Sequence, residues 1–235
     1  MGPKIQKILA SLVMCPVCMQ PLGETEHACC QWCWQRLQLP QKTRCPQCAI
    51  EVTFDGLCGE CLSQPPYFDY SYCLSDFDWP YAALIKKFKY QKQRSLAKLF
   101  AQQMWLQFSD YSYDVEQFVF VPMHWWKKHR RGFNQSQALC QYLSQFSQIP
   151  TDALFKSTFQ TKSLAQLNAK QRQIALIKRF SLRAKPKLKH IVLIDDVMTT
   201  GATLNCLSKQ LKAAGVQRVG VWLIARTAKP NKTGT

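Results

Sequence analysis

Short, mainly apolar runs occur in the second part of the chain, at residues 118–122, 190–195 and 219–225. Runs of this length are typical of strands that are buried on both faces of a parallel sheet. A mixed aromatic and polar run at residues 67–73 predicts a further strand. Between these runs, apolar residues recur at helical spacing. The alternation predicts an α/β fold with a mostly parallel, Rossmann-like sheet that is covered on both faces.

The helical spacing also gives the bounds of the helices. The spacing of apolar residues predicts a helical region from residue 81 to about residue 108, interrupted near residues 90–93. The other helices are expected from Asn134 to about residue 147, at residues 168–178 within a polar and basic stretch, and at residues 203–213 before Gly215.

Cysteine spacing indicates metal binding near the N-terminus. Nine of the twelve cysteines lie between residues 15 and 61, and eight of these form Cys-x-x-Cys pairs. Two such pairs complete a tetrahedral zinc site with Zn–S distances of about 2.3 Å. We therefore predict one or two zinc ions. The predicted ligands are Cys15, Cys18, Cys30, Cys33, Cys45, Cys48, Cys58 and Cys61.

Two pairings satisfy this spacing. Sequential pairing joins the first pair with the second and the third with the fourth, whereas interleaved pairing joins the first with the third and the second with the fourth. Cys29 adjoins Cys30 and is not expected to be a ligand. Disulfides and a redox motif are the alternatives to zinc. Cys73, Cys140 and Cys206 are expected to be buried apolar thiols.

Charge separates the N-terminal part from the rest of the chain. Residues 1–80 carry five Lys/Arg and eight Asp/Glu, a net charge of −3, whereas residues 81–235 carry 26 and six, a net charge of +20. After Asp152 the only acids are Asp195 and Asp196. This balance favours a polyanionic partner, either nucleic acid or a phosphorylated small molecule, although a solvated basic surface would have the same composition.

The Pro65-Pro66 dipeptide marks the end of the Cys-rich region. We expect a structural zinc-ribbon domain at residues 1–66 and the α/β domain at residues 67–235. No apolar stretch is long enough to span a bilayer, and residues 1–14 lack the pattern of a signal peptide. The expected location is the cytoplasm, where thiols stay reduced.

The apolar run at residues 191–194 ends in two acids and a loop rich in hydroxyl groups. The carboxyl ends of strands in open α/β sheets bind ligands. Asp195 and Asp196 suit ribose hydroxyls or Mg²⁺ there. The following loop offers backbone N–H groups, hydroxyls and the flexible Gly201 to one phosphate, next to a helix N-terminus. The predicted ligand-binding residues are Asp195, Asp196, Val197, Met198, Thr199, Thr200, Gly201, Ala202 and Thr203.

A basic loop is expected at residues 127–131, directly after the strand at residues 118–122. It would lie on the same edge of the sheet as the two acids. Arg130 and Arg131 each carry a planar guanidinium that can hold phosphate oxygens, so we predict that they bind a second anionic group. The alternative is an exposed basic turn.

The segment from Val192 to Thr203 resembles the ribose-phosphate motif of the type I phosphoribosyltransferase family. The resemblance implies binding of phosphoribosyl pyrophosphate, with Mg²⁺ on the pyrophosphate side. It also implies that Asp195 and Asp196 face the ribose hydroxyls and that residues 199–203 hold the 5′-phosphate.

The order of motifs along nearly the whole chain is similar to the ComF family of competence proteins. The motifs are the Cys pairs, L-I-K-K-F-K-Y at residues 84–90, Val121-Pro122, R-G-F-N-Q at residues 131–135 and the phosphate motif. The resemblance implies a cytoplasmic protein of natural transformation that handles incoming single-stranded DNA. A competence helicase or another uptake protein would be a partner.

One segment departs from the family pattern. Thr161, Leu167 and Arg172 fit it, but Leu164 stands where the family has Gln. A flexible loop in this place closes over the reacting centre of active phosphoribosyltransferases and excludes water. The departure therefore bears on transfer chemistry rather than on ligand binding, for which Lys162 and Lys170 remain available.

Three functions are compatible with these motifs. The first is a competence protein that binds phosphoribosyl pyrophosphate in its pocket and single-stranded DNA on its basic face. The second is an active phosphoribosyltransferase of unknown acceptor, and the third is a regulator that passes the ligand state to an uptake protein. Tyr90 could stack on bases, whereas Phe88 is expected in the helix core. The predicted DNA-binding residues are Lys86, Lys87, Lys89, Lys92, Arg94, Lys127 and Lys128.

Overall fold

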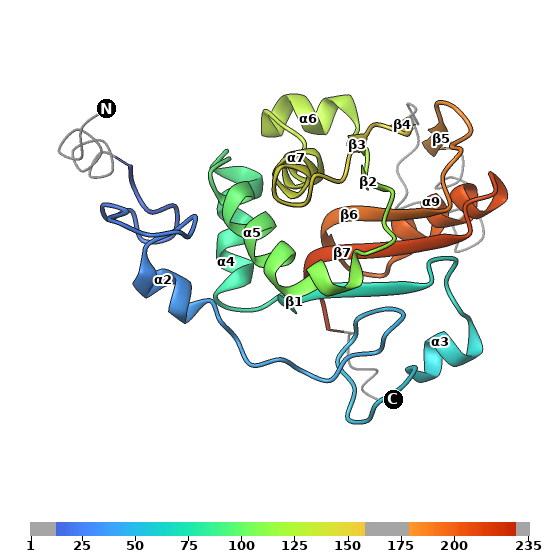
Figure 1. Ribbon diagram of the computed structural model, residues 1–235, viewed down its shortest axis with the longest axis horizontal. Coiled ribbons are helices and arrows are strands. Elements are labelled where there is room, and N and C mark those ends of the chain that lie inside the picture. The colour runs from blue at the N-terminus through green and yellow to red at the C-terminus, as the bar shows by residue number, and fades with distance from the viewer. Residues whose placement is uncertain (1–12, 158–178, 229–235) are drawn as a thin grey trace, which may run out of the picture.

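The computed structural model describes residues 13–157 and 179–228. A five-stranded sheet with the order β1-β7-β6-β2-β3 lies at its centre (Figure 1). Every pairing in this sheet is parallel, which confirms the predicted α/β fold. The strands are β1 (Tyr70–Asp76), β2 (Gln117–Phe120), β3 (Thr151–Asp152), β6 (His190–Met198) and β7 (Arg218–Arg226).

The two central strands alternate their side chains between two hydrophobic cores. Val192 and Ile194 of β6 belong to the core under helices α4 (Tyr81–Tyr90), α5 (Leu96–Phe108) and α7 (Gln135–Ser147). Ile191 and Leu193 belong to the core under α9 (Ala202–Ala213). Because both faces are buried, residues 191–194 of β6 form a continuous apolar run rather than an alternating one.

The interruption predicted near residues 90–93 is the turn between α4 and α5. Lys92 has a positive φ of 55° in this turn, a conformation that does not continue a helix. Phe88 is fully buried, with its ring centroid 5.7 Å from that of Phe100 and 5.4 Å from that of Phe133. It is a core residue, as expected, while Tyr90 is 59% exposed.

Two segments differ from expectation. The basic loop expected at residues 127–131 is instead part of helix α6 (Trp125–Arg131). His124 Nδ1 accepts a hydrogen bond from the Trp126 N–H at its start, and Gly132 ends it with φ 83°. The strand expected to end at Asp195 continues to Met198, because its pairing with β7 runs on to Arg226.

Several short elements were not predicted. They are α2 (Gln31–Arg36), α3 (Gly59–Ser63), the 3-10 helix η1 (Ser109–Tyr111), the edge strand β3, and the antiparallel pair β4 (Phe155–Ser157) and β5 (Phe180–Leu182). Within the described residues, no helix is long and apolar enough to cross a membrane. The helix expected at residues 168–178 lies outside the described residues, as do Thr161, Lys162, Leu164, Leu167, Lys170 and Arg172.

Candidate anion-binding site and metal centres

A pocket of about 170 Å³ lies at the C-terminal edge of the sheet, among residues that follow β2, end β6 and begin α9. It combines acids, cations and hydroxyl groups. The polar residues that line it are Lys127, Arg131, Asn134, Ser136, Arg179, Asp195, Asp196 and Thr203. Sequence reasoning gave Arg131, Asp195, Asp196 and Thr203 to the ligand and Lys127 to DNA, and it missed Ser136 and Arg179.

The two acids have different partners. Ser136 Oγ donates a hydrogen bond of 2.8 Å to Asp195 Oδ1, and the Asp196 N–H donates one of 2.9 Å to the same oxygen. Lys89 Nζ lies 2.8 Å from Asp196 Oδ1, and the side chains of this ion pair are 16% and 10% exposed. Lys89, which the sequence predicted for DNA binding, thus lies at the acid pair.

Asp195 ionises less readily than an ordinary aspartate. Burial is the main cause and the neighbouring charge of Asp196 adds to it, so the pKa of Asp195 is raised to about 7. The hydrogen bond from Ser136 opposes this shift. Near neutral pH the Asp195 carboxyl can therefore both donate and accept hydrogen bonds.

Cationic side chains crowd the wall of the pocket. Lys127 and Arg131 come from α6, and Arg179 directly precedes β5. Partial desolvation and then the charges of Arg179 and Arg131 lower the pKa of Lys127. A bound anion would relieve this mutual repulsion. Arg130 is exposed and does not line the pocket, unlike its neighbour Arg131.

The R-G-F-N-Q block connects α6 to α7. Gly132 ends α6, and Phe133 is buried in the core. Asn134 caps α7, because its Oδ1 accepts a hydrogen bond of 3.0 Å from the Ser136 N–H. Its Nδ2 donates a hydrogen bond of 3.0 Å to the Val121 carbonyl. The cap fixes Ser136, which in turn holds Asp195. The block therefore ties the end of β2 to the acids of β6.

The chain passes from β6 into α9 through residues 199–201. Gly201 has φ 73°, and a Cβ there would lie 3.2 Å from Met198 Sδ, so glycine suits this position best. The N-terminus of α9 follows directly, where backbone N–H groups and the helix dipole favour an anion. Thr203 lines the same pocket as the two acids.

Arg226 connects this loop with the Cys-rich region. Its buried guanidinium donates through Nη1 to the carbonyls of Met198, over 3.0 Å, and Thr199. Its Nε donates to the carbonyl of Cys48 over 3.0 Å. The sequence analysis did not identify this contact. A lone arginine at the end of an apolar strand is the signal that could have indicated it, because a buried cation needs several acceptors.

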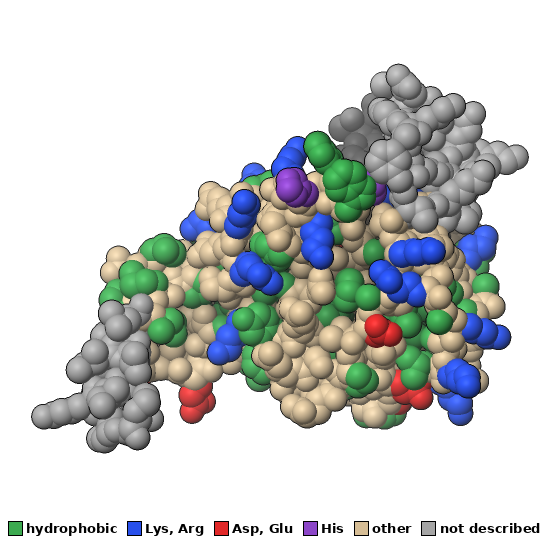
Figure 2. All heavy atoms as spheres, turned by 90° about the horizontal axis from the view of Figure 1, so that it is seen from above, with side chains coloured by type: hydrophobic (Ala, Val, Ile, Leu, Met, Phe, Trp, Pro, Cys, Tyr) green, Lys and Arg blue, Asp and Glu red, His purple; other side chains and the backbone are tan. Residues whose placement is uncertain are grey.

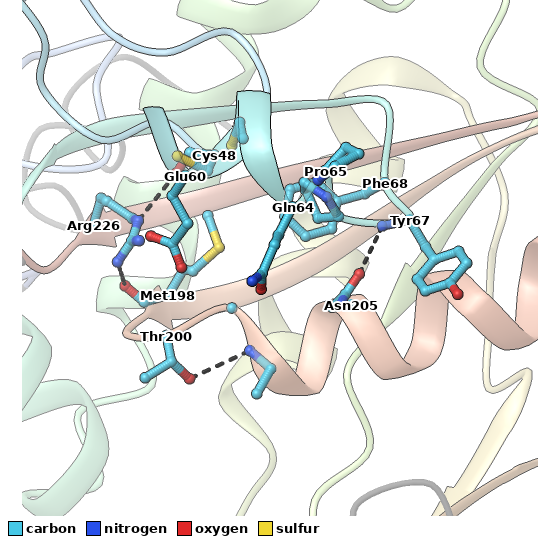
Figure 3. A pocket seen from close by; sticks show the side chains of 14 residues that line it. Cys48, Glu60, Gln64, Pro65, Tyr67, Phe68, Met198, Thr200, Asn205 and Arg226 are labelled. Atoms are coloured by element: carbon cyan, nitrogen blue, oxygen red, sulfur yellow. Dashed lines mark hydrogen bonds between the residues drawn. The ribbon is translucent and has the colours of Figure 1, made fainter. Parts of the chain in front are cut away.

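A second pocket, of about 370 Å³, adjoins Arg226 (Figure 3). Glu60 of α3 and Gln64, which directly follows α3, point into it toward Met198 and the first turn of α9. Thr200, Gly201 and Ala202, predicted to hold the ligand phosphate, line this second pocket rather than the first. Val197 lies half-buried against the hydrophobic core, and Thr199 is exposed.

The eight predicted cysteine ligands form two clusters. One contains Cys15, Cys18, Cys30 and Cys33, and the other contains Cys45, Cys48, Cys58 and Cys61, with the sulfur atoms of each within 4.8 Å of one another. The pairs thus combine sequentially. A tetrahedral zinc ion with Zn–S of about 2.3 Å places its sulfurs about 3.8 Å apart. The Sγ–Sγ distances of 3.8 Å (Cys18–Cys30) and 3.6 Å (Cys48–Cys58) fit that geometry.

The two clusters repeat one local structure. In the first cluster, the backbone N–H of Cys30 donates a hydrogen bond of 3.4 Å to Cys15 Sγ. In the second, the backbone N–H of Cys58 donates a hydrogen bond of 3.3 Å to Cys45 Sγ. Burial opposes ionisation, but these and other backbone N–H groups lower the pKa of Cys15 and Cys45 to about 7. Burial, by contrast, raises the pKa of Cys30, Cys33, Cys48 and Cys61 in the same clusters.

The other cysteines lie outside these clusters. Cys29 is fully buried, and burial raises its pKa to about 12. Cys73, Cys140 and Cys206 are buried, in agreement with the prediction. None of the twelve cysteines forms a disulfide bond.

The two clusters have different neighbours. The first packs against α5, where Gln102 accepts from the Ala28 N–H over 2.8 Å and donates to the Glu26 carbonyl over 3.0 Å. The second packs against β1, where the Ser71 N–H donates to the Pro46 carbonyl over 3.0 Å, and against Arg226. Arg226 therefore links the second cluster to the end of β6 and the loop that precedes α9, because it donates hydrogen bonds to carbonyls on both sides.

The side chains predicted to bind DNA lie on α4, on the turn after it and on α6. Lys86, Lys92, Arg94, Lys127 and Lys128 are exposed, while Lys87 and Lys89 are half-buried. Figure 2 looks onto the side of the molecule on which α6 lies in Figure 1, and it shows Lys and Arg side chains spread across that face with few acids among them.

The fold and the pocket define a phosphoribosyltransferase-like α/β domain preceded by two four-cysteine clusters. A model of the phosphoribosyl transferase domain matches residues 129–234. A solved hypoxanthine phosphoribosyltransferase from Trypanosoma cruzi is 14% identical, with a TM-score of 0.38 over 60% of this chain and 68% of that one.

Three relatives extend over most of the chain. DNA utilization protein YhgH of Escherichia coli K12 is 31% identical over 91% of this chain and 97% of its own length. Competence protein F of Haemophilus influenzae is 31% identical over 90% of this chain and 96% of its own length. Competence protein ComFC of Streptococcus pneumoniae is 26% identical over 87% of this chain and 90% of its own length. The chain belongs to this family of competence protein F, ComFC and YhgH.

Proposed function

We propose that this protein binds phosphoribosyl pyrophosphate in the pocket between α6 and β6 and acts in the cytoplasmic handling of single-stranded DNA during natural transformation. The observation that carries the first part is the pocket itself. It holds an acid pair for a ribose and a group of cations for phosphates within one space of about 170 Å³.

Each part of the ligand has a complementary group. The N-terminus of α9 and Thr203 offer donors to the 5′-phosphate. Asp195 and Asp196 offer acceptors to the ribose hydroxyls, with Ser136 and Lys89 fixing their positions. Lys127, Arg131 and Arg179 offer charge to the pyrophosphate. Arg130, although next in sequence to Arg131, has no direct part in this assignment because it does not line the pocket.

Mg²⁺ fits the same assignment. Carboxylate and phosphate oxygens are the ligands that this ion prefers. Asp195 and Asp196 supply such oxygens beside the place given to the ligand. The ion would neutralise the pyrophosphate charge that the cations of the pocket do not cover.

We propose zinc for both four-cysteine clusters and a structural role for residues 1–66. A small Cys-rich unit gains much of its folding free energy from the metal. Intact thiolate sites of this kind suit the reducing cytoplasm.

The DNA part of the proposal is supported by relatives named for competence and for DNA utilization. The net charge of +20 on residues 81–235 is the matching physical property. A competence helicase or another uptake protein is the partner we propose, and a pull-down with and without the ligand tests it.

A ligand panel tests the pocket. Thermal denaturation is followed with phosphoribosyl pyrophosphate, ribose-5-phosphate, pyrophosphate and a nucleoside triphosphate, each with Mg²⁺. The proposal expects the largest increase in Tm with phosphoribosyl pyrophosphate. Equal increases with the triphosphate and with pyrophosphate would reduce the site to a general anion pocket.

Transfer of the ribose phosphate to an acceptor is the second candidate function, favoured by the match of residues 129–234 to the transferase domain. The chain would contribute orientation of the ribose through Asp195 and Asp196 and charge stabilisation of the departing pyrophosphate through Arg131 and Lys127. Pyrophosphate release across a panel of nucleobases and amines tests it. Binding of the ligand without release in any mixture would favour a binding or regulatory protein.

A further inference from the structure

Helix α6 presents two different surfaces. Lys127 and Arg131, four residues apart and therefore on one face, line the pocket. The outer side carries Trp125 and Trp126, which are 59% and 61% exposed. No residue of α6 is buried, so the tryptophans do not serve the hydrophobic core. Two adjacent exposed indoles are costly to leave in water and indicate a binding partner.

Basic groups accompany these indoles. The last turn of α6 contains Lys128, His129, Arg130 and Arg131, and α6 contains no acid. Trp126 and Arg130 are four residues apart and thus neighbours on the helix surface. The two indole rings meet edge to face, with centroids 5.5 Å apart and planes at 81°, so they do not cover each other's faces as a stacked pair would.

The basic and aromatic surface continues onto α4. The Arg131 guanidinium lies over the ring of Tyr90, 5.2 Å from its centroid, and Tyr90 is 59% exposed. The Lys92 side chain adjoins Gly132: a Cβ added to Gly132 would lie 3.6 Å from Lys92 Cδ. Aromatic rings and cations are therefore interleaved from α6 to the turn after α4.

We propose that the outer face of α6 is a base-stacking site for single-stranded DNA, in which Trp125 and Trp126 stack on unpaired bases while Lys128 and Arg130 bind the phosphates. The proposal rests on the proposed DNA function and names the residues that carry it. An unpaired base offers a whole face to an indole, whereas bases in a duplex are stacked on each other. The surrounding cations match the phosphates of the same strand.

Equilibrium binding of a fluorescent 20-nucleotide dT strand to the full chain, at several salt concentrations, tests the site. The double variant Trp125→Ala/Trp126→Ala is compared with Trp32→Ala, which removes a tryptophan of equal exposure (60%) from α2. Lys128→Ala/Arg130→Ala removes only charge. A strand of abasic sites replaces the bases and keeps the phosphates.

The double tryptophan variant is expected to bind dT about tenfold or more weakly with an unchanged salt slope, because stacking releases no counterions. Its affinity for the abasic strand should equal that of the wild type. Trp32→Ala should bind dT as tightly as the wild type. Lys128→Ala/Arg130→Ala should reduce the slope of log affinity against log salt concentration by about 1–2. Trp126→Phe keeps a ring and should retain most of the affinity, and unchanged Tm values exclude misfolding.

The outcomes separate the two proposals. A double tryptophan variant that binds dT as tightly as the wild type overturns the stacking site and leaves the DNA function intact. A wild type that binds no single strand at low salt overturns the DNA function itself. A wild-type dimer that the double tryptophan substitution dissociates in sedimentation would make this face a contact between copies of the chain, which also overturns the proposal.

Discussion

Lys89 Nζ lies 2.8 Å from Asp196 Oδ1, so a residue of α4 reaches the acid pair at the end of β6. Asp195 is adjacent, and the Asp196 charge raises its pKa. Lys89 thereby partly neutralises two carboxylates that would otherwise repel each other. A basic residue in a surface-like K-K-F-K run thus contacts one of the acids that line the pocket.

We predict that Lys89→Met destabilises the protein by about 1–3 kcal/mol, because it leaves the nearly buried Asp196 without its cation. Urea denaturation measures the effect. The matched double variant Lys89→Met/Asp196→Asn removes the orphaned charge as well and should recover much of the loss. A double variant less stable than Lys89→Met would contradict the pairing.

The Asp195 carboxyl predicts a pH dependence of stability. Its pKa is 3.8 in the unfolded chain and about 7 in the folded one, so between these values the folded state holds a proton that the unfolded state has lost. The associated stability is fully present below pH 3.8 and is lost as the pH rises through 7. Asp195→Asn should therefore gain stability relative to the wild type from pH 5 to pH 8. A difference between the two proteins that is constant over this range would contradict the shift.

Gly201→Ala should weaken phosphoribosyl pyrophosphate binding about tenfold. An L-residue at φ 73° costs about 1–2 kcal/mol, and the new Cβ meets Met198 Sδ at 3.2 Å. Both effects move the loop that precedes α9. Gly215→Ala is the matched control, since Gly215 also has a positive φ, of 100°, but follows α9 at its other end. It should lose stability and keep its ligand affinity in calorimetric titration.

The contact between Arg226 and Cys48 predicts that the two four-cysteine clusters differ in their effect on the pocket. Cys61→Ser in the second cluster should lower ligand affinity several-fold. The substitution loosens the cluster, so that the Cys48 carbonyl positions Arg226 less firmly. Arg226 in turn positions the carbonyls of Met198 and Thr199 less firmly. Cys33→Ser in the first cluster should reduce Tm with little change in affinity. Equal affinity losses in both variants, measured well below their Tm, would show that the Arg226 contact does not transmit the effect.

Arg226→Lys tests the same contact without disturbing any cysteine. A lysine ammonium cannot span the carbonyls on both sides as the guanidinium does. We expect a loss of about 2–4 kcal/mol in stability and a weaker ligand affinity, with the zinc content unchanged. Zinc content is measured by a colorimetric chelator after denaturation, and a variant that loses metal instead would assign Arg226 to the cluster alone.

Local patterns in the sequence were enough for four of the five strands of the sheet, the acid pair and the cysteines of the two clusters. The strands expected at residues 190–195 and 219–225 are mainly apolar runs, and the loop before α9 has a distinctive sequence of hydroxyl residues and glycine. The cysteine spacing predicted the eight cysteines of the clusters but left the pairing open, because the segments between the Cys-x-x-Cys pairs are long enough to close either arrangement. The sequence could not show that Lys89 leaves the surface, since an exposed and an ion-paired lysine have the same local pattern.

Contacts between distant segments were the least predictable part. Ser136 and Asp195 are 59 residues apart, and Arg226 and Cys48 are 178 residues apart. Neither contact has a periodic signal, because each depends on how α7 or the Cys-rich segment packs on the sheet. Helix α6 was missed for another reason. A run of lysine and arginine suggested a loop, although the His124 cap and Gly132 allow one short helix between them.

Calorimetric titration of phosphoribosyl pyrophosphate and Mg²⁺ into Arg131→Ala and Arg130→Ala tests the central claim most directly. The two residues are adjacent and carry the same charge, but only Arg131 lines the pocket. The account predicts one site per chain in the wild type, affinity reduced about tenfold or more by Arg131→Ala, and a change of less than about threefold with Arg130→Ala. Equal losses in both variants, or no binding to the wild type, would contradict it.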